Sequence, residues 1–439
     1  MTATADQAWL DYLRAQAGID DPTHALGRAA PPIRSMLEQT IAGRELLRSE
    51  AEVLFATDGD DLKAVIAAAD HVRRARVGDA VSFVVTRNIN FTNVCYMGCR
   101  FCGFARRREE AGATLMGFDE VAHRAEIARQ RGATEVCVQG GLHPDIPGTY
   151  YRDLVAAIKA QVPQIHVHAF SPFEVWYGSK KRHMPVIEFL RELKDAGLGS
   201  IPGTAAEILD TEVRQKLTRD KLSAKAWVEV IRAAHQAGLR STSTIMYGHI
   251  DEPRHWAAHL DLLRSIQKET GGFTEFVPLG FVHSEAPLYI EREIPGVRAG
   301  ATLVEHLKMH AIARLMLAGW IDNIQVSWVK LGPQTGQALL SAGANDFGGT
   351  LMDESISRSA GASFGEEITA AEMVQIIRDA GRQPVRRSTL YGTLEHYDDH
   401  DPVTIAPLKP RDYDPVSFIR KRPAPPAPVG VELVEASHG

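Results

Sequence analysis

Residues 92–104 read TNVCYMGCRFCGF and contain three of the four cysteines of a 439-residue chain. These three, Cys95, Cys99 and Cys102, have the spacing C-x3-C-x2-C. Thiolates are soft ligands that suit iron–sulfur clusters and zinc, and cysteines this close in sequence can converge on one centre. The stretch therefore predicts a metal-binding loop.

The number and spacing of the cysteines favour an iron–sulfur cluster over other thiol chemistry. A structural zinc site takes four ligands, usually as two separate pairs, and the remaining cysteine, Cys137, would complete such a site only through the fold. A disulfide within the loop would be strained, and nothing in the sequence indicates secretion. A [4Fe-4S] cluster bound by three cysteines leaves one iron free to bind another ligand.

C-x3-C-x2-C is the spacing of the radical S-adenosylmethionine (SAM) enzymes. Their free iron binds the amino and carboxylate groups of SAM, and one electron then cleaves SAM to methionine and a 5′-deoxyadenosyl radical. We therefore expect Cys95, Cys99 and Cys102 to bind a [4Fe-4S] cluster, with SAM as the second cofactor. A zinc site and thiols without a metal are the alternatives that the spacing leaves open.

Composition and charge narrow the class of protein. The formal net charge is −6 at pH 7 and the basic residues are scattered, which argues against the electropositive face of a nucleic-acid-binding protein. The run Lys180-Lys181-Arg182-His183 is an exception, which we interpret as a solvated loop rather than a phosphate-binding patch. No apolar run has the length of a signal peptide or a membrane span. We expect a cytoplasmic protein with no nucleic-acid or membrane partner, in which the thiols stay reduced.

The pattern of apolar residues divides the chain into three regions. Residues 1–78 read as a helical layer, because apolar residues recur at three-to-four spacing, and Asp60 or Asp61 is expected to cap one of its helices. Residues 79–394 form the main domain. Residues 395–439 are predicted to form a flexible, proline-rich tail. The alternative is an ordered strap over the main domain, with apolar anchors at Val416, Phe418 and Ile419.

The main domain alternates short apolar runs with amphipathic helices, which is typical of repeated βα units around a parallel sheet. Eight such units predict an α/β protein with a TIM-type (β/α)8 barrel or a partial barrel. In this architecture the reactive groups gather at the C-terminal ends of the strands. The expected strands are 81–91, 135–140, 166–170, 199–202, 241–247, 275–281, 323–328 and 344–349.

Four residues near strand ends are candidate ligands of SAM. Phe101, inside the cysteine loop, would shield the cluster or the adenine, although ordinary packing explains a lone aromatic equally well. Gly140 and Gly141 follow the second strand, where radical SAM barrels place a glycine-rich segment that receives the amino group of SAM. Glu207 is a candidate for the ribose hydroxyls of SAM, with a carboxylate at the start of a helix as the alternative.

Polar residues near other strand ends are candidate substrate ligands. For each histidine among them, the alternative is a structural residue held by hydrogen bonds. The sequence assigns no catalytic residue. The candidate substrate ligands are His168, Tyr247, His249, Asn345 and Asp346.

These motifs together resemble those of the FO synthase family of radical SAM enzymes, in the branch that acts on tyrosine (CofH). The resemblance covers about residues 40–394 and is more specific than the cysteine spacing alone. Beside the cysteines, it rests on NINFTNVC (88–95), ATEVC (133–137), QGG (139–141), HVHAFSP (166–172), IPGTAAEIL (201–209), MYGH (246–249) and ANDFGGT (344–350).

The resemblance implies a radical SAM transferase that joins the 4-hydroxybenzyl group of L-tyrosine to 5-amino-6-(D-ribitylamino)uracil. In the implied reaction 2-iminoacetate leaves, SAM is consumed, and the product is a precursor of the deazaflavin FO of coenzyme F420. The resemblance also implies an electron donor and, because the chain has one cysteine triad, a separate ring-closing radical SAM subunit as partner. The insertion at residues 177–184 and the tail have no assigned role.

Two alternative functions stay open from the sequence. The menaquinone-pathway radical SAM enzymes, aminofutalosine synthase and the futalosine cyclase, have similar barrels and cysteine loops. The alternative from another class is a non-enzymatic metal protein, either a zinc-stabilised barrel or an electron carrier. Substrate choice depends on cavity residues that the sequence does not place.

Overall fold

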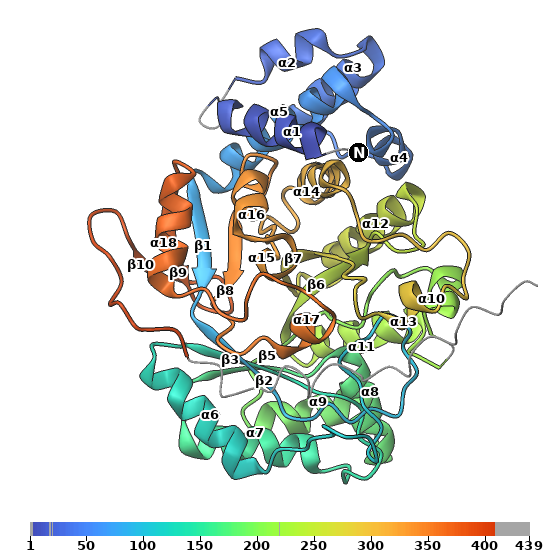
Figure 1. Cartoon of the computed structure of the whole chain (residues 1–439), viewed down its shortest axis with the longest axis vertical. Coiled ribbons are helices and arrows are strands. Elements are labelled where there is room, and N and C mark those ends of the chain that lie inside the picture. Colours follow the sequence, from blue (N-terminus) through green and yellow to red (C-terminus); the bar gives the residue numbers. More distant parts are fainter. Residues whose placement is uncertain (1–2, 17–18, 20, 219, 409–439) are drawn as a thin grey trace, which may run out of the picture.

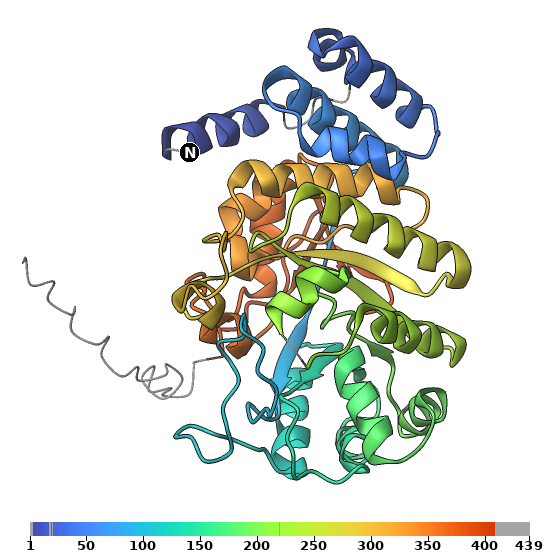
Figure 2. The same ribbon diagram turned by 90° about the vertical axis from the view of Figure 1, so that its right-hand side faces the viewer.

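The computed structural model describes residues 3–16, 19, 21–218 and 220–408. A layer of helices lies at one end of the molecule, and a larger body of helices and sheets lies below it (Figure 1). Helices α4 (Arg48–Phe55) and α5 (Gly59–Val77) of this layer pack on α12 (Pro253–Thr270) and α14 (Leu303–Leu317) of the body, as Figure 2 also shows. The layer consists of α1 (Ala3–Gln16), α2 (Thr23–Arg28), α3 (Pro31–Ile41), α4 (Arg48–Phe55) and α5 (Gly59–Val77).

The longest helix of the layer, α5, begins after Asp58. The Asp58 carboxylate accepts a hydrogen bond from the N–H of Gly59 at 2.8 Å and caps the helix. The prediction that Asp60 or Asp61 caps it is wrong, because both lie inside its first turn. There, the helix dipole favours their negative charge.

Ten described strands form two sheets. The larger sheet has the order β2-β3-β4-β5-β6-β7 and is parallel throughout. The smaller sheet has the order β10-β9-β1-β8, in which β10 runs antiparallel to β9. The strands are β1 (Ala80–Val84), β2 (Thr86–Asn90), β3 (Glu135–Gln139), β4 (His166–Ala169), β5 (Ser200–Ile201), β6 (Arg240–Tyr247), β7 (Phe273–Gly280), β8 (Asp346–Gly349), β9 (Gln383–Arg387) and β10 (Thr393–His396).

One continuous segment joins the two sheets. The expected first strand, 81–91, is two strands, of which β1 pairs with β8 and β9 while β2 pairs with β3. On the other side of the barrel, residues 323–328 were also expected to form a strand. They form two single parallel bridges instead, one to β7 and one to β8. The two sheets therefore make a partial barrel, which is one of the two architectures that the sequence predicts.

Helices cover the outside of the barrel. The most enclosed is α14, in which eleven residues are buried because the N-terminal layer covers its outer face. No helix in the described ranges is long and apolar enough to cross a membrane. The other helices are α6 (Phe118–Gln130), α7 (Tyr150–Gln161), α8 (Pro172–Lys181), α9 (Val186–Asp195), α10 (Thr211–Leu217), α11 (Ala224–Gln236), α13 (Pro287–Ile290), α15 (Trp328–Leu331), α16 (Pro333–Leu339), α17 (Ser355–Ser359) and α18 (Ala370–Asp379).

The first part of the expected tail packs on the barrel. The predicted boundary at residue 395 falls within β10, and Tyr397 stacks on Phe83 with ring centroids 6.0 Å apart. Further along, the guanidinium of Arg131 donates to the carbonyl of Ala406 at 2.5 Å. Residues 395–408 thus follow the surface of the body. The proline-rich segment and the expected strap anchors lie outside the described residues.

A buried cluster of charges ties the N-terminal layer to the barrel. The Asp70 carboxylate of α5 pairs with Arg73 at 2.8 Å and with Arg382, next to β9, at 3.3 Å. Arg382 also reaches Asp79 at 2.8 Å. The side chains of Arg73 and Arg382 are 1% and 3% exposed, so water cannot replace these contacts. The layer and the barrel therefore share part of their stability.

Replacing Asp70 by asparagine should lower the free energy of unfolding by about 3 kcal/mol, because two buried guanidinium groups each lose one of their two carboxylate partners. Urea denaturation followed by circular dichroism measures the change. Asp11→Asn is the matched control, since the Asp11–Arg14 pair has both side chains 61% exposed and should contribute well under about 1 kcal/mol. Equal losses in the two variants would contradict the role of the cluster.

Candidate active site

The cysteine loop follows the C-terminal end of β2. Backbone hydrogen bonds shape it: the N–H of Cys95 donates to the carbonyl of Arg106 at 2.9 Å, and that of Cys102 donates to the carbonyl of Cys99 at 3.2 Å. The three thiols form no disulfide and line one cavity of about 260 Å³. The fold thus brings together the three side chains that the spacing singles out.

The surroundings of the three thiols suit an anionic cluster. Burial raises the pKa of each thiol, and a neighbouring cysteine raises it further. Against this, hydrogen bonds from the backbone of Leu142 and Met97 lower the pKa of the Cys95 thiol, and the Lys221 ammonium lowers that of all three. Hydrogen bonds to sulfur and a nearby cation stabilise the thiolates that bind a cluster.

The donor set fits a multi-iron cluster better than a single ion. A zinc ion needs four ligand atoms at about 2.0–2.3 Å from one point. Within the described ranges, no three Cys, His, Asp or Glu side chains are grouped so as to hold one ion. Cys137, the fourth ligand of the zinc alternative, lies on β3 in the wall of a different cavity. Three thiols around a shared space match a [4Fe-4S] cluster that keeps one iron open.

Gly140 and Gly141 lie where β3 meets the cysteine loop. A Cβ atom on Gly141 would lie 2.3 Å from the carbonyl oxygen of Val94 and 3.0 Å from the Cβ of Cys95. A Cβ atom on Gly140 would lie 2.7 Å from the ring of Phe91. Position 141 therefore excludes a side chain because the backbone of the loop approaches so closely, whereas at position 140 the buried ring of Phe91 takes the space. Their contact with SAM stays a prediction.

Glu174 fixes this glycine segment and is a residue that the sequence analysis missed. Its carboxylate accepts hydrogen bonds from the N–H of Gly140 at 2.9 Å and from the N–H and hydroxyl of Ser171 at 2.8 and 2.7 Å. Burial raises the pKa of Glu174 to about 7. The pattern Ser171-x-x-Glu174 is a capping box at the start of α8, which is the signal that could have identified it.

Phe101, Cys102 and Glu207 line a second cavity, of about 160 Å³, beside the cysteine loop. Glu207 pairs with Lys221 at 2.5 Å and with Arg214 at 3.4 Å. The ammonium of Lys221 in turn lies 4.7 Å from the ring centroid of Phe101. Glu207 does not start a helix, since α10 begins four residues later, so that alternative is wrong. The carboxylate is held at the cavity wall, and its contact with the ribose of SAM stays a prediction.

A third cavity, of about 330 Å³, occupies the barrel interior. It shares Thr204, Thr244, Leu279, Lys330 and Ile356 with the second cavity, so the two spaces are adjacent. This arrangement connects the cysteine loop to a chamber of substrate size.

His168 is the one predicted substrate ligand that lines the barrel cavity. Its Nδ1 lies 2.7 Å from the hydroxyl of Ser200. Burial lowers the pKa of His168 to about 4, so the ring is neutral at neutral pH. The neutral ring can donate or accept one further hydrogen bond.

Tyr247 and His249 do not line the described cavities, and their role as substrate ligands stays a prediction. The Tyr247 hydroxyl lies 2.6 Å from Nδ1 of His306, and the Tyr247 ring packs against Trp256 of α12. The His249 ring lies between Asp251 and the carbonyl of Met246, at 3.0 Å from each. The reason is strand alternation: the even-numbered residues of β6 face the cavities, so position 247 faces the helices.

Asn345 and Asp346 lie at the N-terminal end of β8, away from the cysteine loop, and their role as substrate ligands stays a prediction. Asn345 accepts hydrogen bonds from Arg314 at 2.7 Å and from the N–H of Ile324 at 2.9 Å, and so closes the barrel. Asp346 binds Arg387 through both oxygens, at 2.5 and 3.1 Å. Asp346 therefore acts on the cavity through Arg387, which lines it.

A polar group that the sequence analysis missed lies in the same wall as Arg387. The Glu275 carboxylate accepts hydrogen bonds from the Tyr391 hydroxyl at 2.5 Å and from Gln325 at 3.1 Å. Arg387 lies 3.6 Å away but is already paired with Asp346. Burial therefore outweighs the cation and raises the pKa of Glu275 to about 7.

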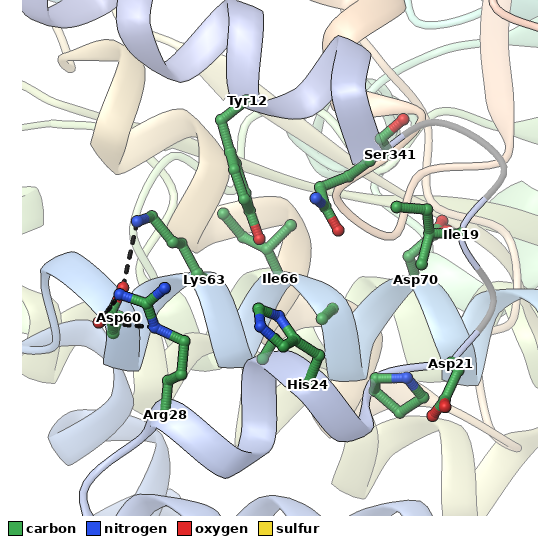
Figure 3. Close-up of a pocket in the computed structure, with 14 residues that line it drawn as sticks. Tyr12, Ile19, Asp21, His24, Arg28, Asp60, Lys63, Ile66, Asp70 and Ser341 are labelled. Carbon is green, nitrogen blue, oxygen red and sulfur yellow. Dashed lines mark hydrogen bonds and ion pairs between the residues drawn. The ribbon is translucent and has the colours of Figure 1, made fainter.

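A fourth cavity, of about 400 Å³, lies between α1, α2 and α5 in the N-terminal layer (Figure 3). Three of its charged groups are paired with each other, since Asp60 contacts Arg28 at 2.8 Å and Lys63 at 3.1 Å. None of its lining residues comes from a barrel strand. We therefore assign no chemistry to it.

Two family models match the chain in succession. The model of the radical SAM superfamily matches residues 89–263, and the model described as "CofH/MqnC C-terminal region" matches residues 270–399. The radical SAM family implies a [4Fe-4S] cluster and SAM as cofactors, which the three thiols and the adjoining cavity fit.

Curated relatives are similar over most of the chain. FO synthase of Nocardia farcinica is 54% identical over 355 residues, which are 81% of this chain and 40% of that protein. A protein of Methanopyrus kandleri named 5-amino-6-(D-ribitylamino)uracil–L-tyrosine 4-hydroxyphenyl transferase is 52% identical over 349 residues, which are 79% of this chain and 94% of that protein. The chain spans about two fifths of the FO synthases that it matches.

Solved structures share the fold. Methylornithine synthase superposes with a TM-score of 0.63 at 20% identity, over 80% of this chain and 97% of that one. The hydrogenase maturase HydG from Carboxydothermus hydrogenoformans gives 0.65 at 16% identity, over 88% and 86% of the two chains. At these identities, the likeness confirms the partial barrel and nothing further.

Replacing Cys99 by alanine should abolish the brown chromophore and the reductive cleavage of SAM after anaerobic reconstitution, because a cluster ligand is lost. Circular dichroism should show an unchanged fold. Cys137→Ala is the matched control and should keep both properties, since Cys137 lines the barrel cavity rather than the cysteine loop. Full SAM cleavage in the Cys99 variant would refute the cluster assignment.

The raised pKa of Glu275 predicts a pH-dependent stability. The folded protein keeps this proton up to about pH 7, whereas an unfolded chain releases it near 4.5, so the contribution is full at low pH and is lost as pH rises through 7. Relative to Glu275→Gln, wild-type protein should lose on the order of 2 kcal/mol of unfolding free energy between about pH 5 and about pH 8. Urea titrations measure the loss.

The control for this series is Glu229→Gln, because the Glu229 side chain is 61% exposed. Its unfolding free energy should follow that of the wild type across the same pH range. If the Glu275 variant also runs parallel to the wild type, the carboxyl group is not protonated in the fold.

Proposed function

Because the chain belongs to the CofH family of radical SAM enzymes, we propose that it is a transferase that joins the 4-hydroxybenzyl group of L-tyrosine to 5-amino-6-(D-ribitylamino)uracil. The products are the hydroxybenzyl adduct of the pyrimidine, 2-iminoacetate, methionine and 5′-deoxyadenosine. The observation that carries the proposal is the similarity to the Methanopyrus transferase, which the chain matches over 94% of its length.

The cavities support this chemistry. A bound cluster supplies the electron that cleaves SAM to methionine and a 5′-deoxyadenosyl radical. In the proposal, Cys95, Cys99 and Cys102 would bind the cluster, and SAM would occupy the cavity that Phe101 and Glu207 line. Gly140 and Gly141, beside Cys95, are kept as candidate ligands of its amino group. Both substrates then bind in the adjacent barrel cavity.

The barrel cavity offers two kinds of surface for two substrates. Val277, Leu279 and Trp328 supply an apolar wall that suits a phenol ring and limits water near reactive intermediates. Thr242, Thr244 and His168 supply hydrogen-bonding groups that suit a ribityl chain and a pyrimidine. The cavity thus offers separate contacts for the donor and the acceptor of the benzyl group.

The partner is also part of the proposal. The FO synthases are more than twice the length of the matched region, and this chain has a single cysteine triad. We infer that the next step, closure of the deazaflavin ring, belongs to a separate radical SAM subunit, and that an external electron donor reduces the cluster. The cytoplasm, where such donors and reduced thiols occur, is the proposed location.

Reconstituted protein incubated with SAM, L-tyrosine and 5-amino-6-(D-ribitylamino)uracil should yield the hydroxybenzyl adduct, detected by mass spectrometry, with one tyrosine consumed per adduct. Omission of the uracil should abolish the adduct. The competing menaquinone-pathway function predicts the opposite result: no consumption of tyrosine, and turnover of a futalosine-type substrate. This comparison is needed because the description of the matching C-terminal family model names both CofH and MqnC.

A further inference from the structure

Lys330 lies on α15, at the boundary between the barrel cavity and the cavity beside the cysteine loop. It lines both spaces. Its ammonium group donates to the hydroxyl of Ser357 at 3.3 Å. An ammonium group has three N–H donors, and among the described residues Lys330 forms no ion pair. A cation with donors to spare therefore faces the place where the two cavities meet.

Lys330 differs in this respect from the other permanent cation of the barrel cavity. The Arg387 guanidinium is bound by both oxygens of Asp346, so its charge is compensated within the protein. Lys330 forms no such ion pair. Burial lowers the pKa of its ammonium group, and the charge of Glu354 offsets part of this lowering. A buried cation without a direct ion pair is costly, so an anionic ligand at this point would gain from binding it.

Glu354 supplies the opposite charge in the same cavity. Its carboxylate accepts hydrogen bonds from the N–H of Ser357 at 2.7 Å and from the amide of Asn88, and both hold it in place. Neither contact compensates the negative charge, and the described structure gives Glu354 no ion pair. Lys330 and Glu354 thus present one positive and one negative group without direct contact with each other. An α-amino acid carries the complementary charges, because its carboxylate and its ammonium group are both attached to the Cα atom.

We propose that Lys330 binds the α-carboxylate of L-tyrosine and Glu354 its α-ammonium group, an inference that rests on the proposed function. The position fits the chemistry, because the Cα–Cβ bond that breaks must lie close to SAM, and Lys330 borders the cavity that contains Phe101 and Cys102. The phenol then extends into the barrel cavity. The groups around Glu275 and Arg387 stay available to the pyrimidine substrate.

Substrate analogues test the two contacts separately. Equilibrium binding to reconstituted, SAM-loaded protein is measured for L-tyrosine, for tyramine, which lacks the carboxylate, and for 3-(4-hydroxyphenyl)propionate, which lacks the amine. Lys330→Met should weaken L-tyrosine binding on the order of 10- to 100-fold and leave tyramine binding unchanged. Glu354→Gln should weaken L-tyrosine binding and leave propionate binding unchanged. Lys330→Arg should restore part of the affinity.

Matched measurements separate this role from a structural one. Lys225→Met is the control, because the Lys225 side chain is 86% exposed, and it should bind all three ligands as the wild type does. Equal losses of tyrosine and tyramine in Lys330→Met would overturn the inference, as would weakened SAM binding with unchanged tyrosine binding. If wild-type protein itself neither binds nor consumes tyrosine, the proposed function fails and not merely this contact.

Discussion

The barrel depends on the place where one strand passes from the smaller sheet to the larger one. Thr350 fastens this junction: its hydroxyl accepts a hydrogen bond from the N–H of Thr86 at 3.0 Å and donates to the carbonyl of Thr86 at 2.8 Å. A Cβ atom on Gly349 would lie 2.3 Å from the Thr86 side chain, so the backbones can approach only at a glycine. Because β1 and β2 are covalently continuous, this contact fixes how the two sheets curve around the cavity.

The charges inside the barrel then divide into two groups. Arg387 with Asp346, and Glu207 with Lys221, are pairs whose members satisfy each other and hold the walls in shape. Lys330 and Glu354 form no direct ion pair in the described structure, with each other or with any other residue. Since an uncompensated buried charge lowers stability, a protein retains it where a ligand supplies the missing partner. This difference separates the groups that build the cavity from those that we expect to recognise a substrate.

Sequence patterns predicted the features that depend on spacing and period. The cysteine triad and the alternation of strands and helices are local, and both are found. What the patterns did not predict is the face of the sheet on which a side chain lies and the point at which a strand begins, because both depend on the neighbouring strands. Tyr247 is the last residue of the expected strand but faces the helices, and Asp346 begins its strand rather than ending it. Lys330 was missed because α15 lies in a segment that reads as the end of a strand, and its lack of a direct ion pair is visible only in three dimensions.

The close contact of Gly141 with the cysteine loop bears on how natural variation in this family should be interpreted. A side chain at this position would meet the carbonyl of Val94 and the Cβ of Cys95, while the core beneath β3 is untouched. Such a substitution would displace Cys95, a predicted ligand of the cluster, without removing buried apolar surface. Stability-based scoring would therefore class it as benign, although the purified protein would be colourless. At position 141, a substitution that leaves the fold intact can still prevent the cofactor from binding.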